Sequence, residues 1–163
     1  MNQTRRQLLQ ASAGTTVMAL AASAGLFKSG DVQAQAQAPA PAWNKAAFDT
    51  KTLQETVKAL GGTTATESKD ITFVTAPDIA ENGAVVPVAI ASKIAKTESI
   101  AILVEKNPNS LSAYFDIPDG TEPFVATRVK MGQTSNVYAL VKADGKYFYA
   151  TKEIKVTLGG CGG

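Results

Sequence analysis

The sequence predicts a mainly β protein: an immunoglobulin-like antiparallel β-sandwich with one N-terminal helix and a flexible glycine-rich C-terminal arm. From Asp70 onward, apolar residues recur with a period of two. Short clusters of Asn, Asp, Gly and Pro separate these runs. Beyond the last run, the chain ends in glycines around its single cysteine. We therefore expect an export signal over 1–36, the sandwich domain over 37–158 and the arm over 159–163.

The N-terminal segment has the layout of a cleavable export signal, with a charged start, an apolar middle and a small-residue cleavage region. Arg5 and Arg6 stand at the start, an Ala-rich stretch follows over 11–26, and Ala alternates with Gln over 33–38. Paired arginines are typical of the twin-arginine route. The alternative is a membrane anchor, but the stretch is shorter than the ~20 residues needed to span a bilayer. We expect a periplasmic protein without membrane insertion.

One helix is predicted, over residues 48–60. Asp49 or Thr50 can cap its start, and Gly61 can end it. The residues that can line its apolar face are Phe48, Leu53, Val57 and Leu60.

The strands are predicted as short alternating or apolar runs. In chain order they cover 71–75, 84–90, 99–105, 111–117, 124–131, 137–141, 146–150 and 154–158. Asn82-Gly83 is a turn signal, and Asp144-Gly145 predicts a hairpin between two of the later strands. Pro87 interrupts the second run and favours an edge position or a bulge. Because the antibody-type Cys…Trp…Cys core is missing, only the sandwich architecture is implied.

Composition removes several classes of function. The chain has no histidine and one cysteine, which excludes Ser-His-Asp triads, histidine-ligated metals and iron–sulfur clusters ligated by this chain alone. Without the leader, 13 basic and 13 acidic residues remain, so no electrostatic footprint for nucleic acid is expected. We expect neither catalytic residues nor a metal site, and hence no enzyme.

The end of the chain is its most informative stretch. After Leu158 come Gly159, Gly160, Cys161, Gly162 and Gly163. Glycine has no side chain to bury, so these five residues, four of them glycines, can form a slim arm that reaches at most ~16–18 Å from the sheet. No side chain beside Cys161 can serve as a base or an oxyanion donor. This suits a thiol that carries a group and is activated by partner enzymes.

Several segments resemble the SoxY family, the carrier subunits of the periplasmic Sox sulfur-oxidation system. The segments are AENGAVVPV (80–88), EKNPN (105–109), TRVKMGQTS (127–135), VKADGK (141–146) and GGCGG (159–163). Ser110 and Gly132 depart from the commoner Pro and Ala of that family.

The resemblance implies a heterodimer with a SoxZ-like β-sandwich subunit. It implies that a c-type cytochrome loads thiosulfate onto Cys161, a hydrolase releases sulfate, and a further enzyme oxidises the sulfane sulfur. It implies no permanent cofactor, only covalent sulfur intermediates on Cys161. The glycines Gly159, Gly160, Gly162 and Gly163 would form the swinging arm.

Two alternatives remain open at this point. Gly162-Gly163 could be activated as a terminal thiocarboxylate, as in ubiquitin-like sulfur carriers, although those are cytoplasmic. The domain could also be a structural sandwich that dimerises through Cys161.

Overall fold

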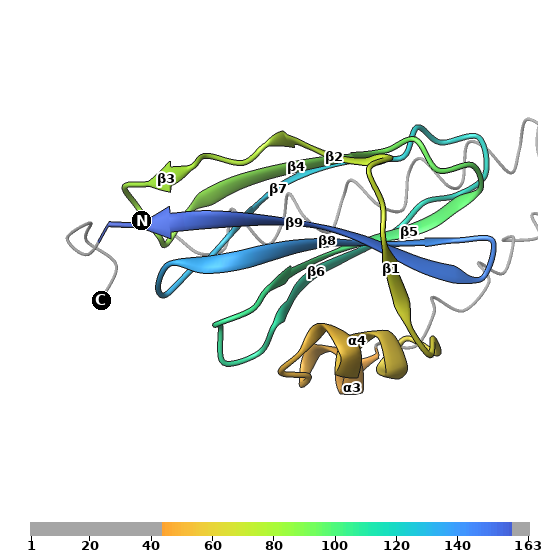
Figure 1. Ribbon diagram of the computed structural model, residues 1–163, viewed down its shortest axis with the longest axis horizontal. Coiled ribbons are helices and arrows are strands. Elements are labelled where there is room, and N and C mark those ends of the chain that lie inside the picture. The colour runs from red at the N-terminus through yellow and green to blue at the C-terminus, as the bar shows by residue number, and fades with distance from the viewer. Residues whose placement is uncertain (1–43, 158–163) are drawn as a thin grey trace, which may run out of the picture. The chain divides into compact units, whose positions relative to one another are not determined.

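The computed structural model describes residues 44–157, and it confirms a mainly β protein built from two sheets (Figure 1). The helices in this range are α3 (Lys45–Phe48) and α4 (Leu53–Ala59). The strands are β1 (Ala65–Glu67), β2 (Ile71–Thr75), β3 (Ile79–Ala80), β4 (Val86–Ser92), β5 (Thr97–Val104), β6 (Leu111–Asp116), β7 (Phe124–Val129), β8 (Ser135–Ala143) and β9 (Lys146–Val156).

The larger sheet has the strand order β1-β9-β8-β5-β6, and the smaller sheet has the order β2-β4-β7. Neighbouring strands are antiparallel, except that the short strands β1 and β3 both run parallel to β9. β1 pairs with the beginning of β9 and β3 pairs with its end. β9 therefore runs from the β8–β9 hairpin at one end of the sandwich to the start of the C-terminal segment at the other (Figure 1).

Alternate residues of the larger sheet build two separate cores. In β5, Ile100 and Ile102 are fully buried against the smaller sheet. Their neighbours Ala101 and Leu103 are buried on the opposite face, in a cluster that includes Val57 of α4. Because both faces of β5 are covered, its sequence is a continuous apolar run and not an alternating one.

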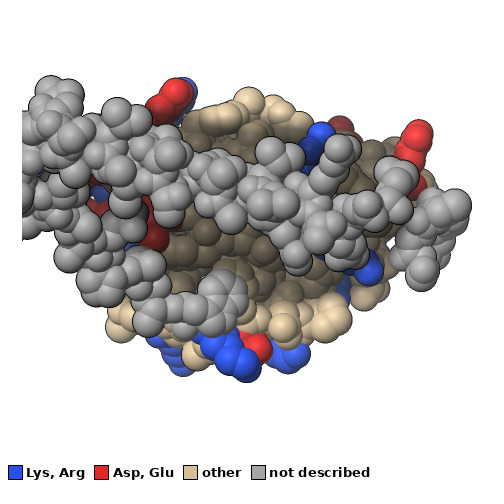
Figure 2. Space-filling view, turned by 180° about the vertical axis from the view of Figure 1, so that it is seen from behind, with Lys and Arg blue, Asp and Glu red and all other residues tan. Residues whose placement is uncertain are grey.

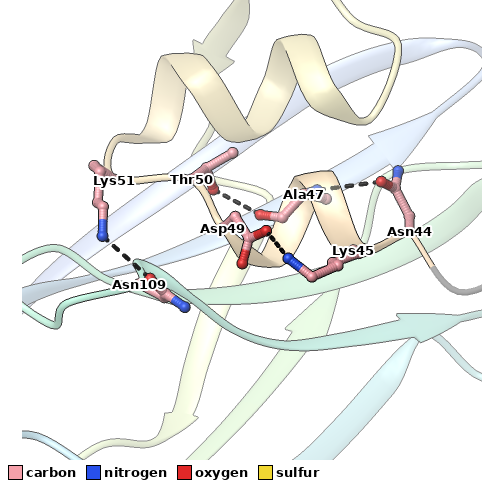
Figure 3. Close-up of polar contacts among 7 residues, drawn as sticks. All are labelled: Asn44, Lys45, Ala47, Asp49, Thr50, Lys51 and Asn109. Carbon is pink, nitrogen blue, oxygen red and sulfur yellow. Dashed lines mark hydrogen bonds and ion pairs between the residues drawn. The ribbon is translucent and has the colours of Figure 1, made fainter.

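The single helix expected over 48–60 is wrong in its extent, because only α4 lies within that range and a separate short helix, α3, precedes it. Thr52 caps α4 by accepting a hydrogen bond from the Glu55 backbone N at 3.2 Å. Between the helices, the Thr50 hydroxyl donates to the Ala47 carbonyl at 2.7 Å (Figure 3). The same hydroxyl also bonds the Thr56 hydroxyl at 2.7 Å. Neither Asp49 nor Thr50 is therefore the start cap of α4. Its predicted end is confirmed.

That end follows from backbone geometry. Gly61 has a positive φ of 89°, and its N–H donates to the Lys58 carbonyl at 3.0 Å. Gly62 N–H donates to the Val57 carbonyl at 2.8 Å. This pattern closes the last turn of α4 with a residue that tolerates the left-handed region.

The strand predictions hold best where alternation is clear, as in β2, which covers 71–75 as expected. The runs expected separately over 146–150 and 154–158 are one strand, β9. Pro87 lies on the middle strand of the smaller sheet, but pairing of β4 with β2 stops at Ala89. On the β2 side, Pro87 therefore occupies a local edge, where its missing N–H interrupts no pairing.

Candidate functional site

The predicted carrier residue Cys161 and its glycines Gly159, Gly160, Gly162 and Gly163 lie outside the described residues, as do Arg5 and Arg6 of the leader. What the structure describes is the point from which the C-terminal segment leaves the sandwich. We call residues 155–157 the arm root. We define the collar as Asp78, Ala80 and Thr134, which accept hydrogen bonds from the arm root, together with Gly83, which lies against Val156, and Met131, which hydrogen-bonds Gly83.

The arm root extends beyond the antiparallel partner of β9. The last pair between β8 and β9 is Ser135 with Ile154. Beyond it, Lys155 N donates to the Asp78 carbonyl at 3.0 Å, and Thr157 N donates to the Ala80 carbonyl at 3.1 Å. These two bonds carry β3 alongside the end of β9 and hold the backbone as far as Thr157.

A side chain takes the place of a strand on the other side of the arm root. The Val156 backbone N donates to the Thr134 hydroxyl oxygen at 3.0 Å. Successive N–H groups of a strand point to opposite sides, so this bond and those to β3 alternate as in a regular ladder. The Thr134 hydroxyl thus extends the sheet by one bond after β8 has ended.

The β3–β4 turn packs directly against the arm root. Asn82 accepts a hydrogen bond from Ala84 N through its side-chain oxygen at 2.9 Å, which confirms the predicted turn. Met131 N donates to the Gly83 carbonyl at 2.7 Å. A Cβ on Gly83 would lie 2.4 Å from the Met131 carbonyl oxygen and 2.8 Å from Val156 Cγ1. Glycine is therefore required here for close approach of backbones.

The β5–β6 turn is hydrogen-bonded to the loop that contains Thr134 and Met131 of the collar. The Asn107 amide donates to the Lys130 carbonyl at 2.7 Å, and its oxygen accepts from Gly132 N at 3.4 Å. Lys106 N donates to the Ser135 hydroxyl at 3.0 Å. The loop between β7 and β8, which contains Thr134, is thereby fastened on both flanks.

Three of the segments that carry the resemblance meet at this end of the sandwich. Residues 80–88 supply the β3–β4 turn, 105–109 the β5–β6 turn and 127–135 the β7–β8 loop. The segment 141–146 lies at the opposite end, in the β8–β9 hairpin (Figure 1).

Charges near the arm root are paired or mixed in sign. The Lys152 ammonium lies 3.0 Å from an Asp78 carboxylate oxygen. Glu105 accepts hydrogen bonds from Asn136 at 2.9 Å and from the Tyr138 hydroxyl at 3.3 Å. Burial raises the pKa of Tyr138, and the nearby Glu105 carboxylate adds to this rise, so the phenol stays protonated.

The described residues offer little to bind a metal or a polyanion. Within 44–157, no three carboxylate or thiol side chains gather as a metal site would require. On the part of the rear face visible in Figure 2, acidic and basic side chains both lie at the rim, without a continuous basic patch. No helix within 44–157 has the length and apolar character needed to cross a membrane.

Sequence reasoning located the Asn82-Gly83 turn but missed the contacts of Thr134 and Asn107. Both residues lie in segments that carry the resemblance, yet a Thr or Asn in a loop carries no sign of its distant backbone partner. Thr52 could have been found, since Thr52 followed by Glu55 is the Ser/Thr-x-x-Glu signal of a helix start.

The family model and one solved structure point to the same family. The model of the family "Sulfur oxidation protein SoxY" matches residues 56–161. The solved structure of the sulfur carrier protein SoxY from Chlorobium limicola f thiosulfatophilum is 37% identical, with a TM-score of 0.57, over 63% of this chain and 92% of its own. The human F-spondin reeler domain is a much weaker likeness, at 7% identity and a TM-score of 0.38 over 58% and 92%. No curated protein matches. Because the family match covers most of the chain and reaches Cys161, this protein belongs to the SoxY family of sulfur oxidation proteins.

Proposed function

We propose that this chain is a sulfur-intermediate carrier of thiosulfate oxidation, which holds covalent adducts on Cys161 and presents them to partner enzymes. The observation that carries the proposal is the family match, whose last residue is the chain's only cysteine. The 37% identical neighbour is itself described as a sulfur carrier protein. In this role Cys161 is an attachment site and the chain performs no catalysis of its own.

The geometry of the arm root supports delivery from a fixed point. The backbone is hydrogen-bonded as far as Thr157, four residues before Cys161. At ~3.3–3.6 Å per residue, the Cys161 backbone can reach about 13–14 Å from Thr157. Four of the last five residues are glycines, so such an arm is slim enough to enter a narrow pocket of a partner.

The proposed reactions need only Cys161 from this chain, because the partner proteins accept the electrons and water supplies the oxygen atom. Loading joins the terminal sulfur of thiosulfate to the Cys161 sulfur to give a cysteine S-thiosulfonate. It releases one proton from the thiol and two electrons, which a c-type cytochrome partner accepts. Water then cleaves the bond between the sulfone and the sulfane sulfur, releasing sulfate and two protons and leaving a persulfide anion on Cys161. A further partner oxidises that sulfur.

The same proposal includes the cellular setting. The chain would be exported through the Arg5-Arg6 signal to the periplasm and would act as a heterodimer with a SoxZ-like β-sandwich subunit. An oxidising compartment suits a thiol that alternates between free and sulfur-bonded states.

The test is the intact mass of the protein isolated from cells given thiosulfate, before and after a reducing agent. We expect reducible sulfane or thiosulfonate additions on the peptide that contains Cys161, and none in the Cys161→Ser variant. That variant should keep its fold and its partner subunit while sulfur-compound oxidation stops.

Other outcomes would point elsewhere. A plain thiol or a simple disulfide homodimer in thiosulfate-fed cells would favour a structural sandwich joined through Cys161. A mass increase at the Gly163 carboxylate would instead indicate a thiocarboxylate carrier. Oxidation that continues in Cys161→Ser would refute the carrier function.

A further inference from the structure

We propose that Thr134 is a positioning residue for the carrier reaction: its hydroxyl fixes the arm root, so that Cys161 is delivered from one defined point. The inference rests on the proposed carrier function. It concerns a residue whose hydroxyl contacts the backbone of β9 at Val156, five residues before Cys161.

The contact is specific to a hydroxyl at this position. Val156 N has no strand carbonyl to meet on the β8 side, because pairing with β8 ends at Ile154. The Thr134 hydroxyl oxygen accepts this N–H at 3.0 Å. Serine could make the same bond, whereas valine keeps the shape of threonine and loses the acceptor.

The loop that holds Thr134 is itself anchored, so the hydroxyl is a fixed acceptor. Asn107 bonds Lys130 and Gly132 on one side of it, and Met131 is 2% exposed with its N–H on the Gly83 carbonyl. Such an anchored loop can restrain a strand end more firmly than a bond to water can.

The restraint sets the length of the tether. With the root held, Cys161 is the fourth residue after Thr157, and with the root frayed back to Ile154 it is the seventh residue after the last fixed one. Effective concentration at the end of a flexible tether falls roughly as the −3/2 power of its length. Complete fraying should therefore lower the concentration of the thiol in a docked partner's pocket about twofold.

The experiment compares Thr134→Val with Thr134→Ser, each as the full mature chain in complex with its partner subunit. Amide hydrogen exchange should accelerate at Val156 about fivefold in Thr134→Val, as loss of one ordinary hydrogen bond predicts, and return to normal in Thr134→Ser. In thiosulfate coupling by the cytochrome partner, kcat should fall measurably, by at most about twofold, while KM stays unchanged, because Thr134→Val alters the delivery of Cys161 and not the docking of the two proteins.

Two controls make the comparison quantitative. Insertion of three glycines after Leu158 lengthens the tether to seven residues with the collar intact, and should lower kcat about twofold without changing exchange at Val156. Alkylation of Cys161 by iodoacetamide should proceed equally in all variants, since a small reagent does not depend on the root.

The outcomes separate the two proposals. Faster exchange at Val156 with an unchanged kcat, unchanged exchange in Thr134→Val, or failure of Thr134→Ser to restore both readouts would each overturn the positioning role. If the unaltered chain takes no sulfur adduct, the carrier function fails and the positioning role falls with it. The presence or absence of a sulfur adduct on the unaltered chain therefore distinguishes failure of the carrier function from failure of the positioning role alone.

Discussion

The two ends of the sandwich are built in different ways. At the hairpin end, consecutive residues turn the chain by their own backbone conformation: Asp144 and Gly145 have φ values of 48° and 71°. At the arm end, segments far apart in the chain are joined by backbone hydrogen bonds. Met131 N donates to the Gly83 carbonyl, and Thr157 N donates to the Ala80 carbonyl. The comparison teaches that a turn can be encoded within four residues, whereas fixing the end of β9 at residues 155–157 needs several loops at once.

The largest effect is expected at the arm end, from Gly83→Ala. The added Cβ would lie 2.4 Å from the Met131 carbonyl oxygen, so backbone must shift. We expect a loss of about 1–3 kcal/mol in the free energy of unfolding, measured by urea denaturation.

Gly132→Ala is the matched control in the same region. A Cβ there meets no atom within 4 Å, so the free energy of unfolding should change by less than about 0.5 kcal/mol. Equal losses in the two variants would show that close approach at Gly83 does not hold the arm end together.

A smaller effect is expected at the hairpin end, from Gly145→Ala. A Cβ at Gly145 has open space, so only its positive φ opposes the change. The free energy of unfolding should fall by about 1–2 kcal/mol, and less for Gly145→Asn, because Asn tolerates this region. Amide exchange at Val156 should stay as in the unaltered protein. Faster exchange there would show that the two ends are coupled.

The smallest effect concerns pH at the hairpin end. Glu98 accepts hydrogen bonds from Lys142, 2.7 Å away, and from Gly145 N at 2.8 Å. The Lys142 bond, followed by that of Gly145, lowers the Glu98 pKa, and Glu98 raises the Lys142 pKa. Because the fold lowers the pKa of Glu98, the ionised carboxylate stabilises the folded protein at pH values above 4.5, the ordinary pKa of this group. This stabilisation is lost as the pH falls below 4.5. Because the fold raises the pKa of Lys142, the protonated ammonium stabilises the folded protein at pH values below 10.5, the ordinary pKa of this group. This stabilisation is lost as the pH rises further.

Lys142→Met should therefore lower the Tm slightly near pH 7, and the difference from the unaltered protein should shrink below pH 4. Lys96→Met is the control, because its partner Asp144 lies 3.3 Å away and both side chains are largely exposed. A Tm difference for Lys142→Met that stays constant down to pH 3 would contradict the role of this pair.

The same contrast explains what could be predicted from the sequence. Alternation located β2, and Asp144-Gly145 located the β8–β9 hairpin, because both signals are local. β1 and β3 have three and two residues, too few to show a period, and only their pairing with β9 defines them as strands.

The break between the two helices and the contact made by Thr134 were beyond local reasoning for the same reason. The break between α3 and α4 follows from the Thr50–Thr56 contact, which a helix pattern does not reveal. For the candidate site, the glycine-flanked cysteine was visible in the sequence, but Thr134 becomes meaningful only when β9 lies beside it.

The two short parallel strands have a consequence for how copies of this protein meet. An open strand edge is a template on which another chain can add a strand and start to aggregate. β1 and β3 occupy both ends of the outer edge of β9, and between them the Lys152 ammonium donates to the Ala76 carbonyl and contacts Asp78. A lysine placed along a sheet edge discourages such addition. Strand addition along this edge of β9 is thus discouraged, so a second copy of the chain should not cover residues 155–157 by that route.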